Sequence, residues 1–244
     1  MQQQIIRGRD NGNVYTISFF LNFGWMLLGP ILFMVPFMVL YMAENGGDIN
    51  VINEERFILG SFVTQLISYV LPIGLAIVIF RKGLKKDLKN FFKKWWLSLS
   101  YIIGGVVAII FISGMLTLIY QELGITGDAS NQAIIEQALN SPLRYVVFLM
   151  VVFGAPIYEE LIFRKFLVGF CEEKLKLNRW IAFLISAVLF ALIHVISDPA
   201  SYIFFFQYFG LSVIITLSYT LSNNNIFVPM GIHFIQNLMS FLLI

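Results

Sequence analysis

Uninterrupted apolar runs of about 20 residues recur along the chain, and they constrain its fold more than any other feature. Each run is long enough to cross roughly 30 Å of hydrocarbon as an α-helix, and a helix satisfies its backbone polar groups within its own segment. Charged residues make up only 12% of the 244 residues, and hydrophobic residues make up 59%. Soluble domains carry roughly 25% charged residues. The sequence therefore predicts an integral membrane protein built from packed helices.

Seven candidate spans lie between the clusters of charged residues. They are Val14–Met42, Phe57–Phe80, Trp95–Tyr120, Tyr145–Phe170, Trp180–Ile196, Tyr202–Thr220 and Ile226–Ile244. The first and the fourth are longer than a bilayer requires, so we expect a kink or a tilt in each. The predicted fold is all-α, a polytopic transmembrane helix bundle that forms one integral membrane domain over residues 1–244.

The basic residues gather between the second and third spans. They are Arg81, Lys82, Lys85, Lys86, Lys89, Lys93 and Lys94. The positive-inside rule places this segment in the cytoplasm, and the alternation of spans then places the N-terminus there too. We expect a multi-pass protein of a cell membrane, and the Ile, Phe and Asn-rich composition favours a bacterial plasma membrane. The lipid bilayer is one expected partner, whereas a net charge of +2 gives no indication of nucleic-acid binding.

A few ionisable residues lie inside the predicted spans. The fourth span contains Glu159, Glu160 and Arg164, and the only histidines of the chain, His194 and His233, lie in the fifth and last spans. A charge near the centre of a bilayer costs at least about 2.5 kcal/mol, so such residues need partners and usually mark function. These positions are therefore the candidate site.

The spacing within the fourth span predicts different roles for the two glutamates. Glu160 and Arg164 are four residues apart, on one helix face, and can form an ion pair. Glu159 is rotated by about 100° from Glu160, so it can face a different cavity and act as a base or a ligand. Glu159 is the predicted catalytic carboxylate, and Glu160 with Arg164 is predicted to support it.

The two histidines can reach the same depth as Glu159. Counting 1.5 Å per residue from the cytoplasmic ends of the spans, Glu159 lies about 16 Å deep, His194 about 21 Å and His233 about 11 Å. His233 and Asn237 are four residues apart, so one helix face presents an imidazole and an amide. In a hydrolase, two such donors fit an oxyanion hole.

Three short motifs in the last part of the chain resemble those of the CPBP family of intramembrane proteases, also called the Abi or CAAX protease family. The family pattern is two glutamates and an arginine, then phenylalanine and histidine four residues apart, then histidine and asparagine or aspartate four residues apart. These positions are met by Glu159, Glu160 and Arg164, by Phe190 and His194, and by His233 and Asn237. The resemblance covers residues 145–244, and the earlier part matches only in having several spans.

The resemblance implies an intramembrane endopeptidase, a hydrolase that acts on membrane proteins or peptide precursors in peptide maturation or bacteriocin immunity. It implies that Glu159 and His194 activate the attacking water. It also implies that His233 and Asn237 stabilise the oxyanion. Members of the family are described with eight spans, so we expect seven to eight.

The cofactor stays open at this point. Glu159, His194 and His233 form the ligand set of a catalytic zinc site with one open position, which would make the protein a metalloprotease. The zincin arrangement of two histidines around a glutamate on one helix is absent. A metal-free site in which Glu159 polarises water fits the same residues.

Two other classes of function remain as alternatives. A proton-coupled transporter also uses buried Glu and His residues as relays, although the sequence shows no pair of broken helices in related halves. A membrane scaffold or immunity protein would bind a partner without cleaving it. The intact motifs favour the peptidase.

Overall fold

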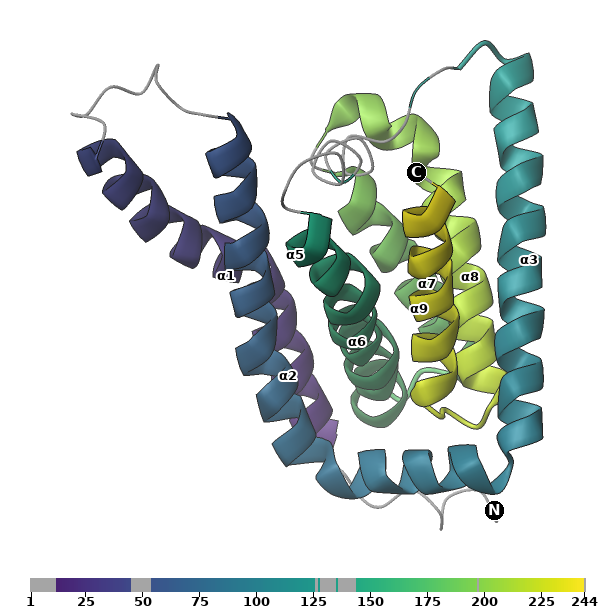
Figure 1. Ribbon diagram of the computed structural model, residues 1–244. Helices are drawn as coiled ribbons and strands as arrows, with labels where there is room; N and C mark the ends of the chain where they lie inside the picture. The colour runs from purple at the N-terminus through teal and green to yellow at the C-terminus, as the bar shows by residue number, and fades with distance from the viewer. Residues whose placement is uncertain are drawn as a thin grey trace.

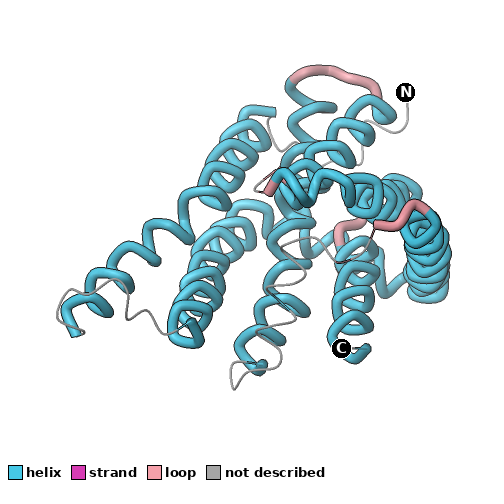
Figure 2. Tube along the Cα trace, turned by 90° about the horizontal axis from the view of Figure 1, so that it is seen from above, coloured by secondary structure: helices cyan, strands magenta, loops and turns pink. Residues whose placement is uncertain are grey.

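The computed structural model describes residues 12–44, 54–125, 127, 135, 144–196 and 198–243 of the chain. Every regular element within these ranges is a helix, as Figure 2 shows. The predicted all-α, polytopic membrane bundle is thus confirmed. The predicted cytoplasmic N-terminus, residues 1–11, lies outside the described ranges.

The helices follow the predicted spans along the chain. The first three are α1 (Gly12–Glu44), α2 (Glu54–Lys93) and α3 (Trp95–Glu122). A composite helix follows, made of α5 (Arg144–Phe148), η3 (Leu149–Gly154), α6 (Ala155–Glu160), η4 (Leu161–Leu167) and η5 (Phe170–Lys174). The last are α7 (Arg179–Val195), η6 (Pro199–Phe204), α8 (Phe205–Leu221) and α9 (Phe227–Leu243). In the described ranges, 5 helices are long and apolar enough to cross a membrane, and α7 and α9 are shorter apolar helices.

The second helix differs from its prediction. It continues as a helix to Lys93 instead of ending near Phe80, and Figure 1 shows its last part turning to run across one end of the bundle before α3 begins. Leu84, Leu88 and Phe91 follow the i, i+4, i+7 spacing of an amphipathic helix. The basic segment predicted as a loop is therefore a helix that lies across the ends of the others.

The composite helix of residues 144–174 forms the centre of the bundle. The largest buried cluster includes its residues Tyr158, Phe163 and Phe166, with side chains from α1, α2 and α7 packed around them. Figure 1 shows α1 and α2 on one side of it, α7 and α9 close by, and α3 on the far side against α8 and α9. The two glutamates of the predicted site thus lie on the innermost helix.

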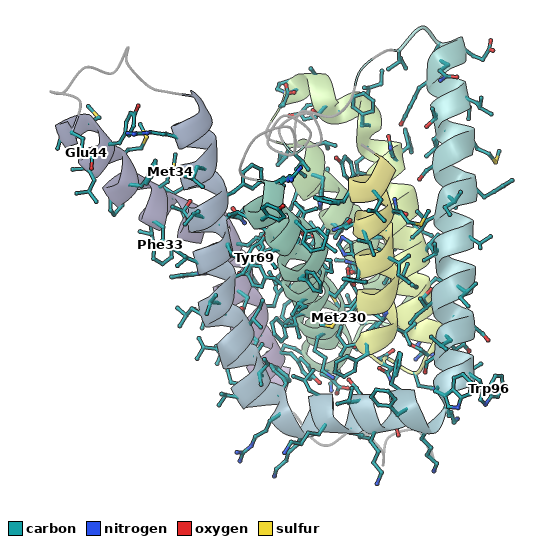
Figure 3. All side chains as sticks on the ribbon, viewed as in Figure 1. Phe33, Met34, Glu44, Tyr69, Trp96 and Met230 are labelled. Atoms are coloured by element: carbon teal, nitrogen blue, oxygen red, sulfur yellow. The ribbon has the colours of Figure 1, made fainter. Side chains whose placement is uncertain are left out.

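The periphery of the bundle is apolar, as a bilayer requires. Large aliphatic side chains on α1, α2 and α3 are exposed, including Leu21 at 67%, Val78 at 67% and Phe111 at 67%. Figure 3 shows Trp96 at the same end of the molecule as the crossing part of α2, and Glu44 at the opposite end. Tryptophan favours the membrane interface, so Trp96 marks the level of one interface.

Small residues let α3 and α9 approach closely. A Cβ atom added at Gly105 would lie 2.5 Å from Cδ1 of Ile232, and one added at Gly231 would lie 2.7 Å from Cδ1 of Ile102. Small residues at helix interfaces are the usual device for close packing in membranes. This contact fixes the depth at which α9 holds His233.

Candidate active site

The predicted long fourth span contains π-helical turns, which the sequence analysis did not anticipate beyond a kink. η3 precedes the glutamate pair and η4 follows it. Because Pro156 has no backbone N–H, the carbonyl of Val151, five residues earlier, cannot complete the π-helical hydrogen bond to it. Isolated π-helical turns are frequent at functional sites, and here they flank both glutamates.

Asn237 of α9 supplies the missing donor. Its Nδ2 donates a hydrogen bond of 2.8 Å to the carbonyl oxygen of Val151. A buried carbonyl without a donor is costly, so this bond stabilises the irregular turn. The structure therefore gives one N–H of Asn237 to the backbone and leaves the second N–H of its amide for any other role.

Glu159 faces His194. Their Oε2 and Nε2 atoms lie 3.9 Å apart, and the two side chains are only 14% and 15% exposed. Nδ1 of His194 lies 2.8 Å from the carbonyl oxygen of Phe190, and since a carbonyl only accepts, Nδ1 carries the proton. When the ring is neutral, Nε2 presents a lone pair toward Glu159.

Helix α7 positions His194 in its last turn. The helix begins after Asn178, whose side-chain oxygen accepts hydrogen bonds of 2.9 Å from the backbone N–H groups of Trp180 and Ile181. The imidazole ring is packed between Phe190, at 4.4 Å between ring centroids, and Tyr208 of α8, at 4.7 Å. The ring orientation is thus fixed by a hydrogen bond and by two aromatic neighbours.

Glu160 forms a separate, fully buried network. Its Oε2 lies 3.1 Å from Nε of Arg164, so the ion pair expected from the spacing is present. Its Oε1 lies 2.8 Å from Nδ1 of His233, and Nη2 of Arg164 donates a hydrogen bond of 2.9 Å to Oγ of Ser212 in α8. Glu160 and Arg164 together therefore connect the composite helix with α8 and α9.

The two networks belong to one cluster. The guanidinium of Arg164 lies 4.6 Å from the centroid of Phe190, and the same ring lies 6.0 Å from that of His233. Arg164 is also close enough to both glutamates to interact with their charges. The structure thus brings together all the predicted site residues apart from Asn237, which is bonded to the backbone of η3.

Two residues that contact the site, Ser212 beside Arg164 and Tyr208 beside His194, could not be found from the motifs. Ser212 and Tyr208 lie in α8, where neither an ionisable residue nor a motif draws attention to them. Their four-residue spacing places both on one face of α8, which packs against α7. Only the tertiary arrangement shows that this face contacts Arg164 and His194.

The predicted metal ligands were tested by their geometry. Among the described residues, which include Glu159, His194 and His233, no group of three His, Cys, Asp or Glu side chains is arranged to hold a metal ion. Nδ1 of each histidine is bonded, to the Phe190 carbonyl in one case and to Glu160 in the other, so only Nε2 of each ring is left to hold a metal. The zinc alternative therefore stays a prediction.

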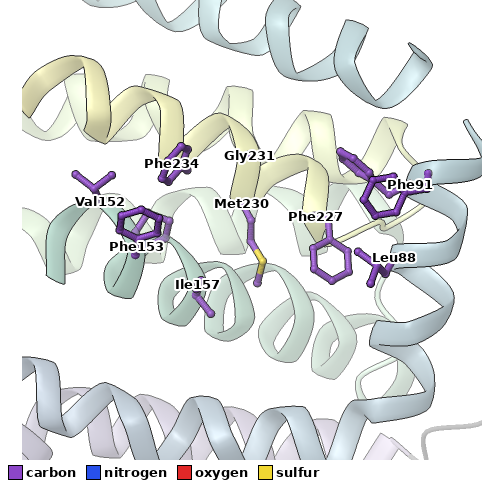
Figure 4. Close-up of a pocket in the computed structure, with 11 residues that line it drawn as sticks. Leu88, Phe91, Val152, Phe153, Ile157, Phe227, Met230, Gly231 and Phe234 are labelled. Carbon is purple, nitrogen blue, oxygen red and sulfur yellow. The ribbon is translucent and has the colours of Figure 1, made fainter. Parts of the chain in front are cut away.

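An apolar cavity of about 380 Å³ lies beside the cluster. Figure 4 shows it between α9 and the composite helix, with the crossing end of α2 closing one side. It is lined by Leu88, Phe91, Phe92, Val152, Phe153, Pro156, Ile157, Phe227, Met230, Gly231 and Phe234. The helices that carry Glu159 and His233 thus form two of its walls.

Comparisons with known proteins support the resemblance. Residues 141–239 match the model of the type II CAAX prenyl endopeptidase Rce1-like family. The chain is 32% identical over 144 residues to "Putative membrane peptidase YdiL" of Bacillus subtilis, covering 58% of this chain and 57% of that protein. It is 41% identical over 78 residues to "UPF0177 protein YbdI" of Lactococcus lactis, covering 32% of this chain and 38% of that protein.

A third relative is named "Membrane-embedded CAAX protease MroQ" of Staphylococcus aureus, at 30% identity over 126 residues, which is 52% of this chain and 48% of that protein. The matched regions thus span at most 57% of the length of these relatives. No solved structure matches the chain significantly. The matched segment contains every residue of the three motifs. Residues 141–239 are therefore similar to the Rce1-like family, and the resemblance inferred from the motifs is confirmed.

Proposed function

We propose that this protein is an intramembrane endopeptidase that hydrolyses peptide bonds with water activated by Glu159 and His194. The observation that carries the proposal is the 3.9 Å separation of Glu159 Oε2 and His194 Nε2 in a nearly buried cluster. Both atoms are hydrogen-bond acceptors when the carboxylate is charged and the ring is neutral. A water molecule within hydrogen-bond distance of both can donate one proton to each and keep a lone pair for attack.

These two groups are sufficient to accept the proton of the attacking water and to return it to the leaving amine. Glu159 takes a proton from water as the oxygen attacks the substrate carbonyl, and a tetrahedral oxyanion forms. The departing amine then takes this proton from Glu159, either directly or through Nε2 of His194, which returns the pair to its starting state. No covalent enzyme intermediate is needed.

His233 is the proposed oxyanion donor. Since Glu160 is also paired with Arg164, it is a carboxylate, and Nδ1 of His233 donates to it. Nε2 can donate to an oxyanion when the ring is an imidazolium, in which both ring nitrogens carry a proton. The second N–H of Asn237 is the proposed additional donor.

The substrate is proposed from the surroundings of the cluster. The cavity beside the glutamates is apolar, which suits a hydrophobic segment of a membrane protein or a peptide precursor. The relatives named as membrane peptidase and CAAX protease support this class. Peptide maturation or bacteriocin immunity, in a bacterial plasma membrane with the N-terminus in the cytoplasm, is the proposed setting.

The experiment compares membranes that contain wild type, Glu159→Ala or His194→Ala, with processing of membrane peptides followed by mass spectrometry. Glu172→Ala, at the end of the same composite helix, is the matched control for loss of a carboxylate. We expect cleavage products with wild type and the control, and none with the two site variants. Equal processing by all four proteins would remove the peptidase assignment.

A further inference from the structure

The crossing end of α2 is a strongly basic helix at one membrane interface. It runs from Arg81 to Lys93 and is followed, after Lys94, by Trp95 and Trp96, which are 59% and 62% exposed. Figure 1 shows this segment crossing the end of the bundle, and Figure 3 places Trp96 beside it. A helix at this level, flanked by interfacial tryptophans, lies where phospholipid headgroups lie.

The segment has two chemically different faces. At 100° per residue, its helical basic side chains fall within about 140° of the circumference. They are Arg81, Lys82, Lys85, Lys86, Lys89 and Lys93, all of them exposed; we call them the basic face. Leu84 and Phe91 fall on the opposite side, where both are part-buried, and the exposed Leu88 lies at the border between the two faces.

The one acidic residue of the segment, Asp87, points inward. Its Oδ2 lies 3.2 Å from Nζ of Lys165 in η4, and its backbone carbonyl accepts a hydrogen bond of 2.8 Å from Asn225, just before α9. These contacts pin the inner side of the segment to two helices of the bundle. The segment from Arg81 to Lys93 thus carries six basic residues and one acidic residue.

We propose that the basic face of α2 is a binding surface for the anionic headgroups of phospholipids. The surface is planar, positive and level with the interface, and an anionic leaflet presents phosphates in one plane at that level. Each basic residue near such a surface strengthens binding by about fivefold. The exposed Phe92, at the edge of the basic face, favours a lipid surface over a soluble polyanion because it can enter the acyl region.

Bound headgroups would also fix one wall of the apolar cavity. Leu88, Phe91 and Phe92 come from this segment, and Figure 4 shows Leu88 near Phe227 of α9. A segment held by lipid on its outer side and by Asp87 on its inner side has little freedom to move. The proposal concerns the surface itself and does not depend on the proposed peptidase activity.

Native mass spectrometry of the delipidated full chain in detergent tests the proposal. Phosphatidylglycerol and phosphatidylcholine with identical acyl chains are the probes, and inorganic phosphate is added in a separate arm as a competitor. The test variant is the triple Lys82→Gln, Lys85→Gln, Lys89→Gln. The matched control removes three exposed basic residues from the end of η5 to the start of α7, as Lys174→Gln, Lys176→Gln, Arg179→Gln.

We expect wild type to bind phosphatidylglycerol at least tenfold more tightly than phosphatidylcholine, as ionic attraction to several lysines requires. The test variant should lose at least tenfold in phosphatidylglycerol affinity, while the control keeps most of it and both variants keep the wild-type thermal unfolding temperature. Hydrogen exchange of residues 81–93 should slow on adding phosphatidylglycerol. Equal affinity for the two lipids, an equal loss in the control, or full displacement by millimolar inorganic phosphate would each overturn the proposal.

Discussion

Nδ1 of His233 lies 2.8 Å from Oε1 of Glu160, so the second glutamate of the pair holds a histidine from another helix. Both side chains are almost completely buried, as is Arg164 on the other oxygen of the same carboxylate. A buried carboxylate between two cationic or proton-donating partners is stable only while all of them are present. This relationship makes Glu160 a structural centre and distinguishes it from Glu159.

Replacing Glu160 by Gln should therefore destabilise the protein strongly. Breaking a buried pair leaves Arg164 as an uncompensated charge, which typically costs about 3–5 kcal/mol. Thermal unfolding of the purified variant in detergent measures the effect, and Glu122→Gln, at the exposed end of α3, is the control. An unfolding temperature equal to that of the control would show that Glu160 is not the centre of the network.

The hydrogen bond from Asn237 to the Val151 carbonyl predicts that the effects of Asn237→Ala and Pro156→Ala on stability are coupled. Asn237→Ala should cost about 1–3 kcal/mol, because the Val151 carbonyl loses its donor. Pro156→Ala restores a backbone N–H that can reach this carbonyl, so Asn237→Ala should cost less in that background. A double-mutant cycle in unfolding free energy measures the coupling. Strict additivity would mean that Asn237 does not compensate for the proline.

Two neighbouring glycines of α3 test the close packing against α9. A side chain at Gly105 would meet Ile232, whereas nothing lies within 4 Å of a Cβ atom at Gly104. Gly105→Val should lower stability by about 1–3 kcal/mol through overpacking, and Gly104→Val should have little effect. Thermal unfolding of the two variants side by side decides this. A larger loss in Gly104→Val would contradict the described interface.

Metal removal distinguishes water activation by Glu159 and His194 alone from water activation by a bound zinc ion. With Glu159 and His194 as the water-activating pair, exhaustive treatment of the purified protein with a chelator should leave its peptide cleavage rate unchanged. Elemental analysis of the same sample measures bound zinc. Loss of cleavage on chelation, with recovery on adding zinc, would instead support the ligand set of Glu159, His194 and His233.

The features that depend on local spacing could be predicted from the sequence. The four-residue interval between Glu160 and Arg164 predicted their ion pair, which is present, and apolar runs placed the helices to within a few residues except at the end of α2. The i, i+4, i+7 spacing of Leu84, Leu88 and Phe91 indicates that the helix continues. A search for long apolar runs does not find this part, because an amphipathic helix at the surface contains many charged residues.

The partners that come from other helices could not be predicted. Spacing cannot show that His233 pairs with Glu160, because this depends on the relative rotation of α6 and α9. Ser212 belongs to no motif, and its role follows only from the packing of α8 beside Arg164. The bond from Asn237 to Val151 depends on a π-helical turn, for which the sequence offers only Pro156 as a signal.

The most direct test of the account is the cleavage rate of one identified peptide by Glu159→Gln, His194→Ala and the double variant, all purified and compared with wild type at the same pH. If the two residues activate one water, each single variant should lose at least about a hundredfold in kcat, and the double variant should be little worse than either, because groups that act as a unit are not additive. Unfolding temperatures near that of wild type would exclude loss of the fold. Wild-type rates in either single variant, or losses that multiply in the double variant, would contradict the shared role of Glu159 and His194.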